Sequence, residues 1–286
     1  MNAALWKKSF LESRWLLAAS LAFMFCVHWL RVYIASFFTS SDLENMFGFM
    51  PEVVEKLLPV SFEQIASVAG RIAAEYDDPV VLLLMTVWSI SRGSDAVSGE
   101  LNRGTLEMVL AQPVTRLSVL VSQAGVTVIG AALLAVAAWL GSSMGLATVT
   151  LEVTLSPVVF IPAALNLFAL GVFLAGLTTM VSAATSYRAR TIGVVGGFYA
   201  ISMIAKIVSR LVPPWKWLAY VSFFTAFEPQ AVVANAARRW SFWVTPQSGP
   251  AEAGALTYDV ILIGLGFACY VAAAVIFSRR DLPAPL

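Results

Sequence analysis

Charged residues at helical spacing make residues 99–116 the part of the sequence best suited to contact another molecule. The segment reads GELNRGTLEMVLAQPVTR and separates two long apolar runs. Arg103 lies three residues after Glu100 and four before Glu107, so on a helix it can bridge both carboxylates. Each such pair stabilises an exposed helix by only about 0.2–0.5 kcal/mol, so the apolar side of this helix must pack against the rest of the protein.

Three ionisable residues inside the apolar runs are candidate intramembrane polar sites, namely His28, Arg31 and Lys206. His28 and Arg31 are three residues apart and therefore share a helix face. Arg31 lies about 10 Å from the end of its run at helical rise, so its side chain can reach water, which favours anchoring over transport. His28 is the only histidine, so a site made of several histidines is excluded, and packing against another helix is favoured.

The sequence lacks the motifs of the common catalytic sites. It contains no Gly-x-x-x-x-Gly-Lys-Ser/Thr phosphate loop and no His-Glu-x-x-His zinc motif. Asp259, followed by Gly264 and Gly266, faintly resembles an intramembrane aspartyl protease, but Phe267 stands where the second aspartate would be. We therefore expect a protein that is not an enzyme, holds no metal and does not hydrolyse ATP itself.

The composition is that of a polytopic helical membrane protein. Of 286 residues, 59% are hydrophobic and 12% are charged, about half the charged share of soluble domains. Several apolar runs reach the roughly 20 residues that a helix needs to cross a bilayer. We expect an all-α fold, with residues 1–286 as a single transmembrane domain. The six predicted spans are residues 15–38, 79–98, 117–141, 157–183, 191–210 and 256–277.

Basic residues near the span ends orient these helices. Cytoplasmic loops carry an excess of Lys and Arg, and an even number of spans places both termini on one side. One side collects Lys7, Lys8, Arg14, Arg92, Arg103, Arg116, Arg188, Arg190, Arg279 and Arg280, against Lys56, Arg71, Arg210, Lys216, Arg238 and Arg239 on the other. Both termini and residues 99–116 are therefore expected in the cytoplasm.

In this setting residues 99–116 predict a short amphipathic helix along the membrane surface. Gly99 allows the chain to turn out of the second span, and Pro113 ends the helix. The charges of Glu100, Arg103 and Glu107 are expected to face outward. The alternative is an ordinary solvated loop.

Two outer segments, residues 39–78 and 211–255, are long enough for structure of their own. The first has helical patterns at residues 52–58 and 62–76, and its acids suggest either a solvated cap or a vestibule for cations. Its eight acids are Asp42, Glu44, Glu52, Glu55, Glu63, Glu75, Asp77 and Asp78. In the second, prolines 213 and 214 end the fifth span, and the aromatic residues that follow predict re-entrant or interfacial helices before the last span.

The motif GExxRGTLExxLxxPVxR in residues 99–116 closely resembles the inner loop of type-2 permeases of ATP-binding cassette (ABC) transporters. The resemblance extends over nearly the whole chain: six spans, an N-terminal inner segment and a long first outer loop. WLAYVSFF at residues 217–224, with Glu228 and Pro229, resembles the outer helices before the last span, although Asp is more frequent at position 228. The most similar subgroup contains the permeases of nitrous-oxide-reductase maturation and many multidrug or peptide exporters.

The resemblance implies that this loop is the coupling helix, which contacts a separate ATPase subunit. The residues that match the motif are Glu100, Arg103, Gly104, Thr105, Leu106, Glu107, Leu110, Pro113 and Arg116. It also implies that ATP and Mg²⁺ belong to the partner ATPase and that no cofactor is bound here. A second permease subunit, in a homodimer or heterodimer, and membrane lipid are the other expected partners, without nucleic acid.

The resulting expectation is the membrane-spanning half of an ATP-driven exporter in the bacterial inner membrane. One alternative is an ATP-independent channel or ion-coupled transporter, for which His28, Arg31 and Lys206 are the deep candidates. Another is a membrane assembly factor that does not transport. The sequence does not identify the substrate.

Overall fold

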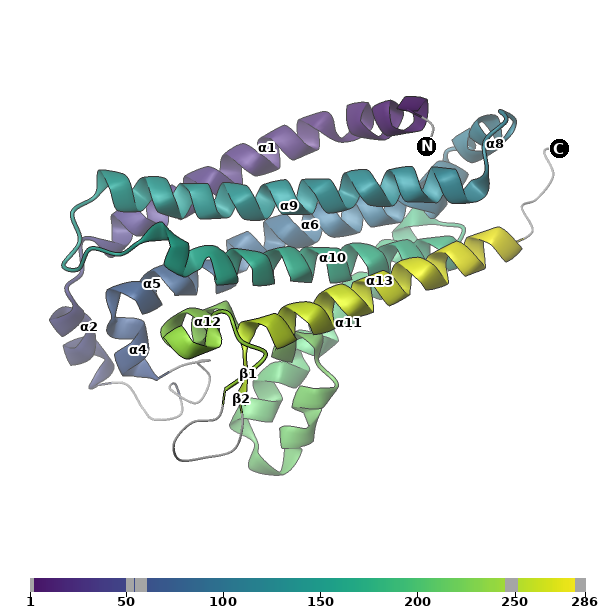
Figure 1. The fold of residues 1–286 in the computed structure, drawn as a ribbon. Coiled ribbons are helices and arrows are strands. Elements are labelled where there is room, and N and C mark those ends of the chain that lie inside the picture. The colour runs from purple at the N-terminus through teal and green to yellow at the C-terminus, as the bar shows by residue number, and fades with distance from the viewer. Residues whose placement is uncertain (1–2, 50–53, 55–60, 245–251, 281–286) are drawn as a thin grey trace.

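The computed structural model describes residues 3–49, 54, 61–244 and 252–280, which form an elongated bundle of long helices (Figure 1). The predicted helix at residues 52–58 lies, apart from Val54, outside these residues. Among the described residues, six helical segments are long and apolar enough to cross a membrane, which confirms the all-α, six-span prediction. They contain α1 (Ala3–Ala35), α6 (Pro79–Ser94), α9 (Arg116–Thr148), α10 (Ile161–Ala184), α11 (Arg188–Leu211) and α13 (Ala255–Arg279).

Several helices are longer than the apolar runs that predict them. The first begins at Ala3 rather than residue 15, so α1 has 33 residues. At helical rise it is about 50 Å long, against a hydrocarbon core of about 30 Å. The polar first turns continue the helix because their Ser9 and Ser13 side chains are buried against neighbouring elements. Hydropathy alone therefore places the start of this helix too late.

The second span belongs to a longer helical rod with changes of winding along it. It starts at α5 (Val68–Ala74) and the 3₁₀ turn η1 (Glu75–Asp77), and it ends in the π-helical turn η2 (Asp95–Gly99) and α7 (Glu100–Asn102). Between them, α6 begins where the Asp78 side chain accepts a hydrogen bond from the Val80 amide and Pro79 occupies the first turn.

The central helix of the bundle is α10. Most of its residues are buried, and it packs against α6, α9 and α13. Small residues permit close approach, which drives helix packing in lipid. A Cβ on Gly176 would lie 2.3 Å from the Gly266 carbonyl oxygen of α13, so these two backbones are in direct contact.

By contrast, α11 is loosely attached and diverges from the other long helices (Figure 1). Its buried residues are Thr191, Val195, Ser202 and Ser209. It ends at Leu211, directly before the two prolines that were predicted to stop it. The next helix, η4 (Pro213–Tyr220), packs back along α11.

Short helices close the end of the bundle opposite to α8 (Thr105–Leu110). They are α2 (Ser40–Phe47), α4 (Phe62–Ala66), η3 (Pro157–Phe160), η5 (Phe223–Ala226), α12 (Pro229–Ala234) and η6 (Ala236–Arg238). Strand structure in the described residues is limited to β1 (Trp243–Val244) and β2 (Glu252–Ala253), in which Trp243 pairs with Ala253.

Acidic residues at this closed end make contacts within the chain. Asp78 pairs with Arg31, Asp42 accepts hydrogen bonds from Thr39, and Glu75 is buried. Asp78 therefore joins the start of α6 to α1, and Asp42 binds Thr39 at the start of α2, whereas neither carboxylate oxygen of Glu75 has a hydrogen-bond partner in the part of the chain that the structure describes.

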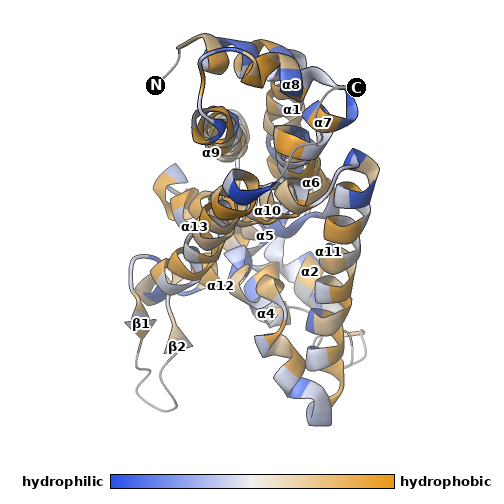
Figure 2. Cartoon of the chain, turned by 90° about the vertical axis from the view of Figure 1, so that its right-hand side faces the viewer, coloured by the Kyte–Doolittle hydropathy of each residue, from blue (hydrophilic) through white to orange (hydrophobic). Residues whose placement is uncertain are grey.

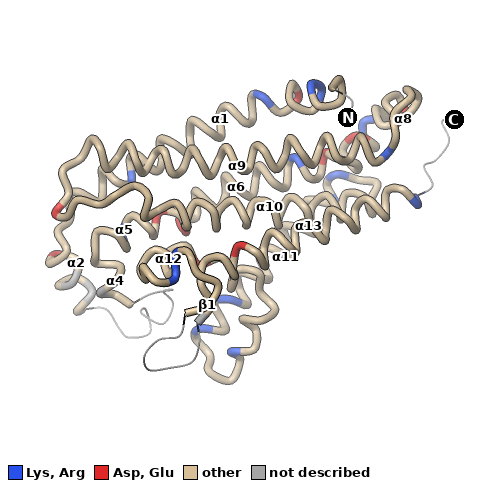
Figure 3. The backbone as a smooth tube through the Cα atoms, in the orientation of Figure 1, with Lys and Arg blue, Asp and Glu red and all other residues tan. Residues whose placement is uncertain are grey.

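The first turns of α1 and the last turns of α13 lie near α8, at the other end of the bundle (Figure 1). Hydrophobic residues extend along the long helices, whereas hydrophilic segments gather around α7 and α8 (Figure 2). Lys and Arg are likewise frequent close to the N-terminus and α8 (Figure 3). Which side of the membrane this end faces stays a prediction.

The contact between α10 and α13 predicts a sharp difference between two glycines. Gly176→Val should be destabilising by about 1–3 kcal/mol, because the new side chain forces two packed backbones apart. Gly264→Val is the matched control, since its Cβ would have no atom within 4 Å. Thermal unfolding in detergent should show a lower midpoint for Gly176→Val alone, and equal midpoints for both variants would contradict the packing described.

Candidate functional site

Residues 99–116, which we call the docking segment, are divided by a left-handed turn at Gly104, between α7 and α8. Gly104 has φ +70°, a conformation that glycine adopts without strain. This corrects the prediction of one continuous helix that turns out of the span at Gly99. Gly99 is helical, and its small size is needed because a Cβ there would lie 2.3 Å from Asp95 Oδ1.

Leu106 fixes α8 to the bundle. Its side chain is fully buried in a cluster formed by Val97, Leu120, Ala183, Ala273 and Phe277. Leu110 packs against the edge of the same cluster. The cluster joins α8 to η2, α9, α10 and α13. Leu106 therefore supports the docking segment from beneath and does not itself face a partner.

Glu100 is buried, which corrects the prediction that it faces outward. Lys8 Nζ of α1 donates to its Oε1 at 3.0 Å, Arg103 Nη2 lies 3.5 Å from the same oxygen, and the Thr105 hydroxyl donates to Oε2. A buried carboxylate is stable only when it is paired and hydrogen-bonded in this way. Glu100 thus attaches both halves of the docking segment to α1.

Asp95 is the second acidic centre at the base of this segment. Arg103 Nη1 donates to its Oδ1 at 2.8 Å, Arg188 Nη1 lies 3.5 Å from that oxygen, and Arg92 Nη1 lies 4.0 Å from Oδ2. Burial alone would lower the pKa of the Arg103 guanidinium, but the hydrogen bond and charge of Asp95 outweigh it and raise the pKa. Asp95 therefore links the docking segment to the start of α11.

The helix continues past the Arg92–Asp95 pair, through η2 into α7. Arg92 is buried, and its Nη2 donates to Ser9 Oγ at 2.8 Å and to Gln123 Oε1 at 2.7 Å. It thereby joins α6 to α1 and α9.

The contacts of two other motif residues, Glu107 and Arg116, were not predicted from the sequence. The predicted Arg103–Glu107 bridge is absent, and within the described residues no ion pair involves Glu107. Arg116 Nη1 donates to the Arg280 carbonyl at 2.7 Å and to the Phe277 carbonyl at 3.3 Å. It satisfies carbonyl groups at the end of α13, so it stabilises the bundle and leaves its guanidinium partly occupied.

The surface left for a partner is a mixed polar and apolar patch, which we call the docking face. It consists of Asn102, Arg103, Gly104, Met108, Ala111, Gln112 and Pro113. Met108 is 71% exposed, whereas Leu106, two residues earlier, is fully buried. Beside it lies a groove of about 460 Å³ between α1 and α8. Sequence reasoning missed Met108, although its position four residues after Gly104 was the available signal.

Of the three candidate intramembrane polar residues, His28 and Arg31 lie on α1 and Lys206 lies on α11, and each makes structural contacts. His28 is fully buried, its Nδ1 lies 3.0 Å from the Met24 carbonyl oxygen, and its ring packs edge-on against Tyr76. Arg31 pairs with Asp78. Lys206 Nζ donates to the Phe227 carbonyl at 2.8 Å.

A buried polar junction near Lys206 was not predicted. Asn166 Nδ2 of α10 donates to Asp259 Oδ1 of α13 at 2.9 Å, and its Oδ1 accepts from the Glu228 amide at 3.1 Å. The Glu228 carboxylate in turn accepts from Arg210 of α11 at 2.7 Å. This junction joins three spans to the segment before α12, which accounts for the polar residues in otherwise apolar helices.

Comparison with models of protein families shows which family this chain belongs to. A family model described as ABC-2 family transporter protein matches residues 7–282. The chain belongs to this family. As an ABC-2 transporter protein it is a permease component of an ABC transporter, a membrane component whose family associates with an ABC ATPase. A comparison with curated proteins gives no match. The subgroup suggested by the sequence stays a prediction.

The contrast between Leu106 and Met108 predicts which residue supports α8. Leu106→Ala should cost about 2–5 kcal/mol of local stability, because it leaves a cavity under α8. Met108→Ala should change stability little, since the side chain is mostly exposed. Hydrogen exchange by mass spectrometry should show faster exchange in residues 105–110 for Leu106→Ala only. Equal protection in both variants would mean that Leu106 does not hold α8.

Proposed function

We propose that the chain is the membrane-spanning half of an ATP-driven exporter, with the docking face as its contact for the ATPase subunit. The observation that carries this proposal is the docking segment itself. A short helix presents an exposed methionine and a charged rim, while Leu106, Glu100 and Asp95 fix it to the spans beneath. A loop that only connected two spans would not need the buried Glu100 and the multiply paired Asp95 directly before its turn.

These contacts offer a path for mechanical coupling. A shift of α8 moves the Leu106 cluster, which contacts α9, α10 and α13. It also moves Arg103, whose partners Glu100 and Asp95 are paired with Lys8 on α1 and Arg188 on α11. Closure of the ATPase dimer would thus bias two arrangements of the bundle from a distant site, which is the definition of allosteric coupling.

The division of labour follows from the motifs. The sequence has no phosphate loop, so ATP and Mg²⁺ are assigned to the partner ATPase and this chain supplies the path through the membrane. The excess of Lys and Arg at the α8 end supports a cytoplasmic location for the docking face and both termini, and the family resemblance supports the bacterial inner membrane. Export as the direction of transport rests on the family resemblance.

The contacts of the polar residues do not favour the alternative of an ATP-independent channel. His28, Arg31 and Lys206 are held by Met24, Asp78 and Phe227 respectively. They lie on two different helices and do not converge on a common path. The second alternative is an assembly factor without transport activity. Such a protein would need the docking face only if it also bound the ATPase.

The docking proposal predicts that Met108→Glu weakens binding of the cognate ABC ATPase at least tenfold. An exposed apolar anchor at a protein interface commonly contributes 2 kcal/mol or more, and about 1.4 kcal/mol corresponds to tenfold in affinity. Binding is measured by biolayer interferometry with the permease in nanodiscs, alongside Arg103→Glu.

The matched control is Phe49→Glu, which places the same charge on a 91% exposed residue at the closed end of the bundle. It should bind the ATPase like the wild type. If Met108→Glu also binds with unchanged affinity while the chain remains monodisperse, the ATPase does not dock on this face.

A second permease subunit is proposed to pack against α11. Gly193 and Gly197 lie four residues apart on one side of this helix, and a Cβ on either would have no atom within 4 Å. The same is true of Gly196 between them. Glycines on a span allow close helix approach in lipid, and here that approach is not used within the chain.

Gly197→Leu should therefore reduce the dimeric fraction, because a large side chain separates the paired helices. Gly264→Leu on α13 is the control, since it also adds volume at a site with open space around the Cβ. The mass of particles in nanodiscs should fall from dimer to monomer for Gly197→Leu only. A dimer that survives Gly197→Leu but not Gly264→Leu would place the interface on α13.

A further inference from the structure

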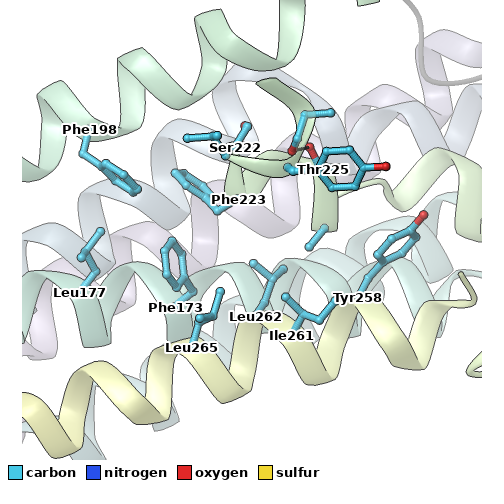
Figure 4. A pocket seen from close by; sticks show the side chains of 14 residues that line it. Phe173, Leu177, Phe198, Ser222, Phe223, Thr225, Tyr258, Ile261, Leu262 and Leu265 are labelled. Atoms are coloured by element: carbon cyan, nitrogen blue, oxygen red, sulfur yellow. Dashed lines mark hydrogen bonds between the residues drawn. The ribbon is translucent and has the colours of Figure 1, made fainter. Parts of the chain in front are cut away.

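A lateral groove separates α11 from α13 in the half of the bundle away from the docking face. Its floor is Phe173 and Leu177 of α10, and its walls are Phe198 of α11 and Leu265 of α13 (Figure 4). The cavity measures about 440 Å³, within the range of about 300–1,000 Å³ typical of small-molecule sites. It is outside the docking face and outside the buried junction of Asn166 and Asp259.

The groove is polar at one end only. Ser222, Thr225 and Tyr258 bring hydroxyl groups to the end formed by η4 and η5 (Figure 4). Tyr220, the last residue of η4, also lines the groove, and hydrocarbon side chains line the rest. Ser222 Oγ donates to the Ser202 carbonyl and Thr225 Oγ1 to the Ala219 carbonyl, so both oxygens keep capacity to accept a hydrogen bond. None of the fourteen described lining residues is charged.

The groove opens sideways, between two spans. On its rim, Phe198 is 38% exposed and Leu265 is 47% exposed, while Leu262 on the floor is fully buried. Since α11 and α13 both cross the membrane, this opening meets the hydrocarbon of the bilayer. A ligand can therefore enter from the lipid phase without passing through water.

The apolar floor, the hydroxyl groups at one end and the lateral opening together determine which kind of molecule the groove can bind. A peptide or an ion would leave polar groups unsatisfied against the apolar floor, at a cost of several kcal/mol. A long alkyl chain fits the apolar part, and neutral groups that donate hydrogen bonds fit the hydroxyl end. We propose that the groove binds an amphiphile with one acyl chain along α10 and an uncharged, hydroxyl-bearing head group at η4 and η5, and that this is the substrate class.

As a substrate site, the groove rests on the proposed transport function. Its α11 wall is connected to both ends of the molecule. Arg188 contacts Asp95 at the base of the docking segment, and Arg210 contacts Glu228 beside η5. Movement of the docking segment would therefore reach the wall that limits the groove.

The test uses a monoacylglycerol with a diazirine in the middle of its chain, photolysed with the permease in nanodiscs. Labelling should concentrate on peptides of α10, α11 and α13 that line the groove, and excess unlabelled monoacylglycerol should abolish it. Leu265→Trp fills the groove from its exposed rim and should lower labelling at least fivefold. Val271→Trp is the control, because Val271 is 48% exposed on the same helix but does not line the groove.

A separate variant tests whether the hydroxyl end of the groove recognises the head group. Tyr220→Phe removes one hydroxyl from a residue that is 92% exposed, so folding is preserved. It should reduce labelling by the monoacylglycerol about threefold, which equals about 0.7 kcal/mol at about 1.4 kcal/mol per tenfold and lies within the range for one hydrogen bond. A plain alkyl diazirine should label the groove more weakly than the monoacylglycerol does, and Tyr220→Phe should not change its labelling. If both probes label the groove equally strongly, the amphiphile assignment is wrong.

Two readouts separate this inference from the proposed function. Monoacylglycerol should stimulate ATP hydrolysis by the wild-type complex but not by a complex containing Leu265→Trp. Labelling spread over the exposed faces of α1 and α9, with ATPase binding intact, would overturn the groove and leave the permease role standing. Labelling confined to the groove without ATPase binding would overturn the proposed function, and with it the cargo assignment.

Discussion

The pairing of the buried Glu100 and the partly buried Asp95 with four cations at the base of the docking segment determines how the rest of this protein is arranged. Glu100 and Asp95 are adjacent in the helical rod that contains the second span, but their partners come from α1, α6 and α11 as well as from the segment itself. The buried Glu100 carboxylate in particular is not stable in this position without its partners. The start of the first helix, the end of the second span and the start of the fifth are thereby held in one place.

Packing around α10 supplies the rigid part against which this ionic centre can act. The direct backbone contact of α10 with α13 leaves little freedom between these helices, whereas α11 has few buried residues and is held mainly at its two ends. The bundle thus combines a fixed half with a helix that can be displaced. The proposed transport function needs this combination, because one side of the path must remain formed while the other opens.

The sequence predicted the parts of the fold that depend on local pattern. Apolar runs located the six spans, the prolines after Leu211 ended the fifth, and the motif in residues 99–116 gave the family. It did not predict the burial of Glu100, because the lysine that pairs with it lies 92 residues away. The contact of Asn166 with Asp259 spans 93 residues and was missed for the same reason. Partners brought together by tertiary structure leave no signal in a helical wheel.

The π-helical turn at Asp95–Gly99 sets the rotational register of everything that follows it. A π turn accommodates one residue more than the α-helix it interrupts, and each residue of an α-helix advances about 100° around the axis. Without that residue, Glu100 would point away from Lys8 and the left-handed turn at Gly104 would direct α8 elsewhere. The number of residues in the π turn therefore sets the orientation of the docking face. Insertions or deletions in this turn disturb that orientation more than substitutions on the face itself.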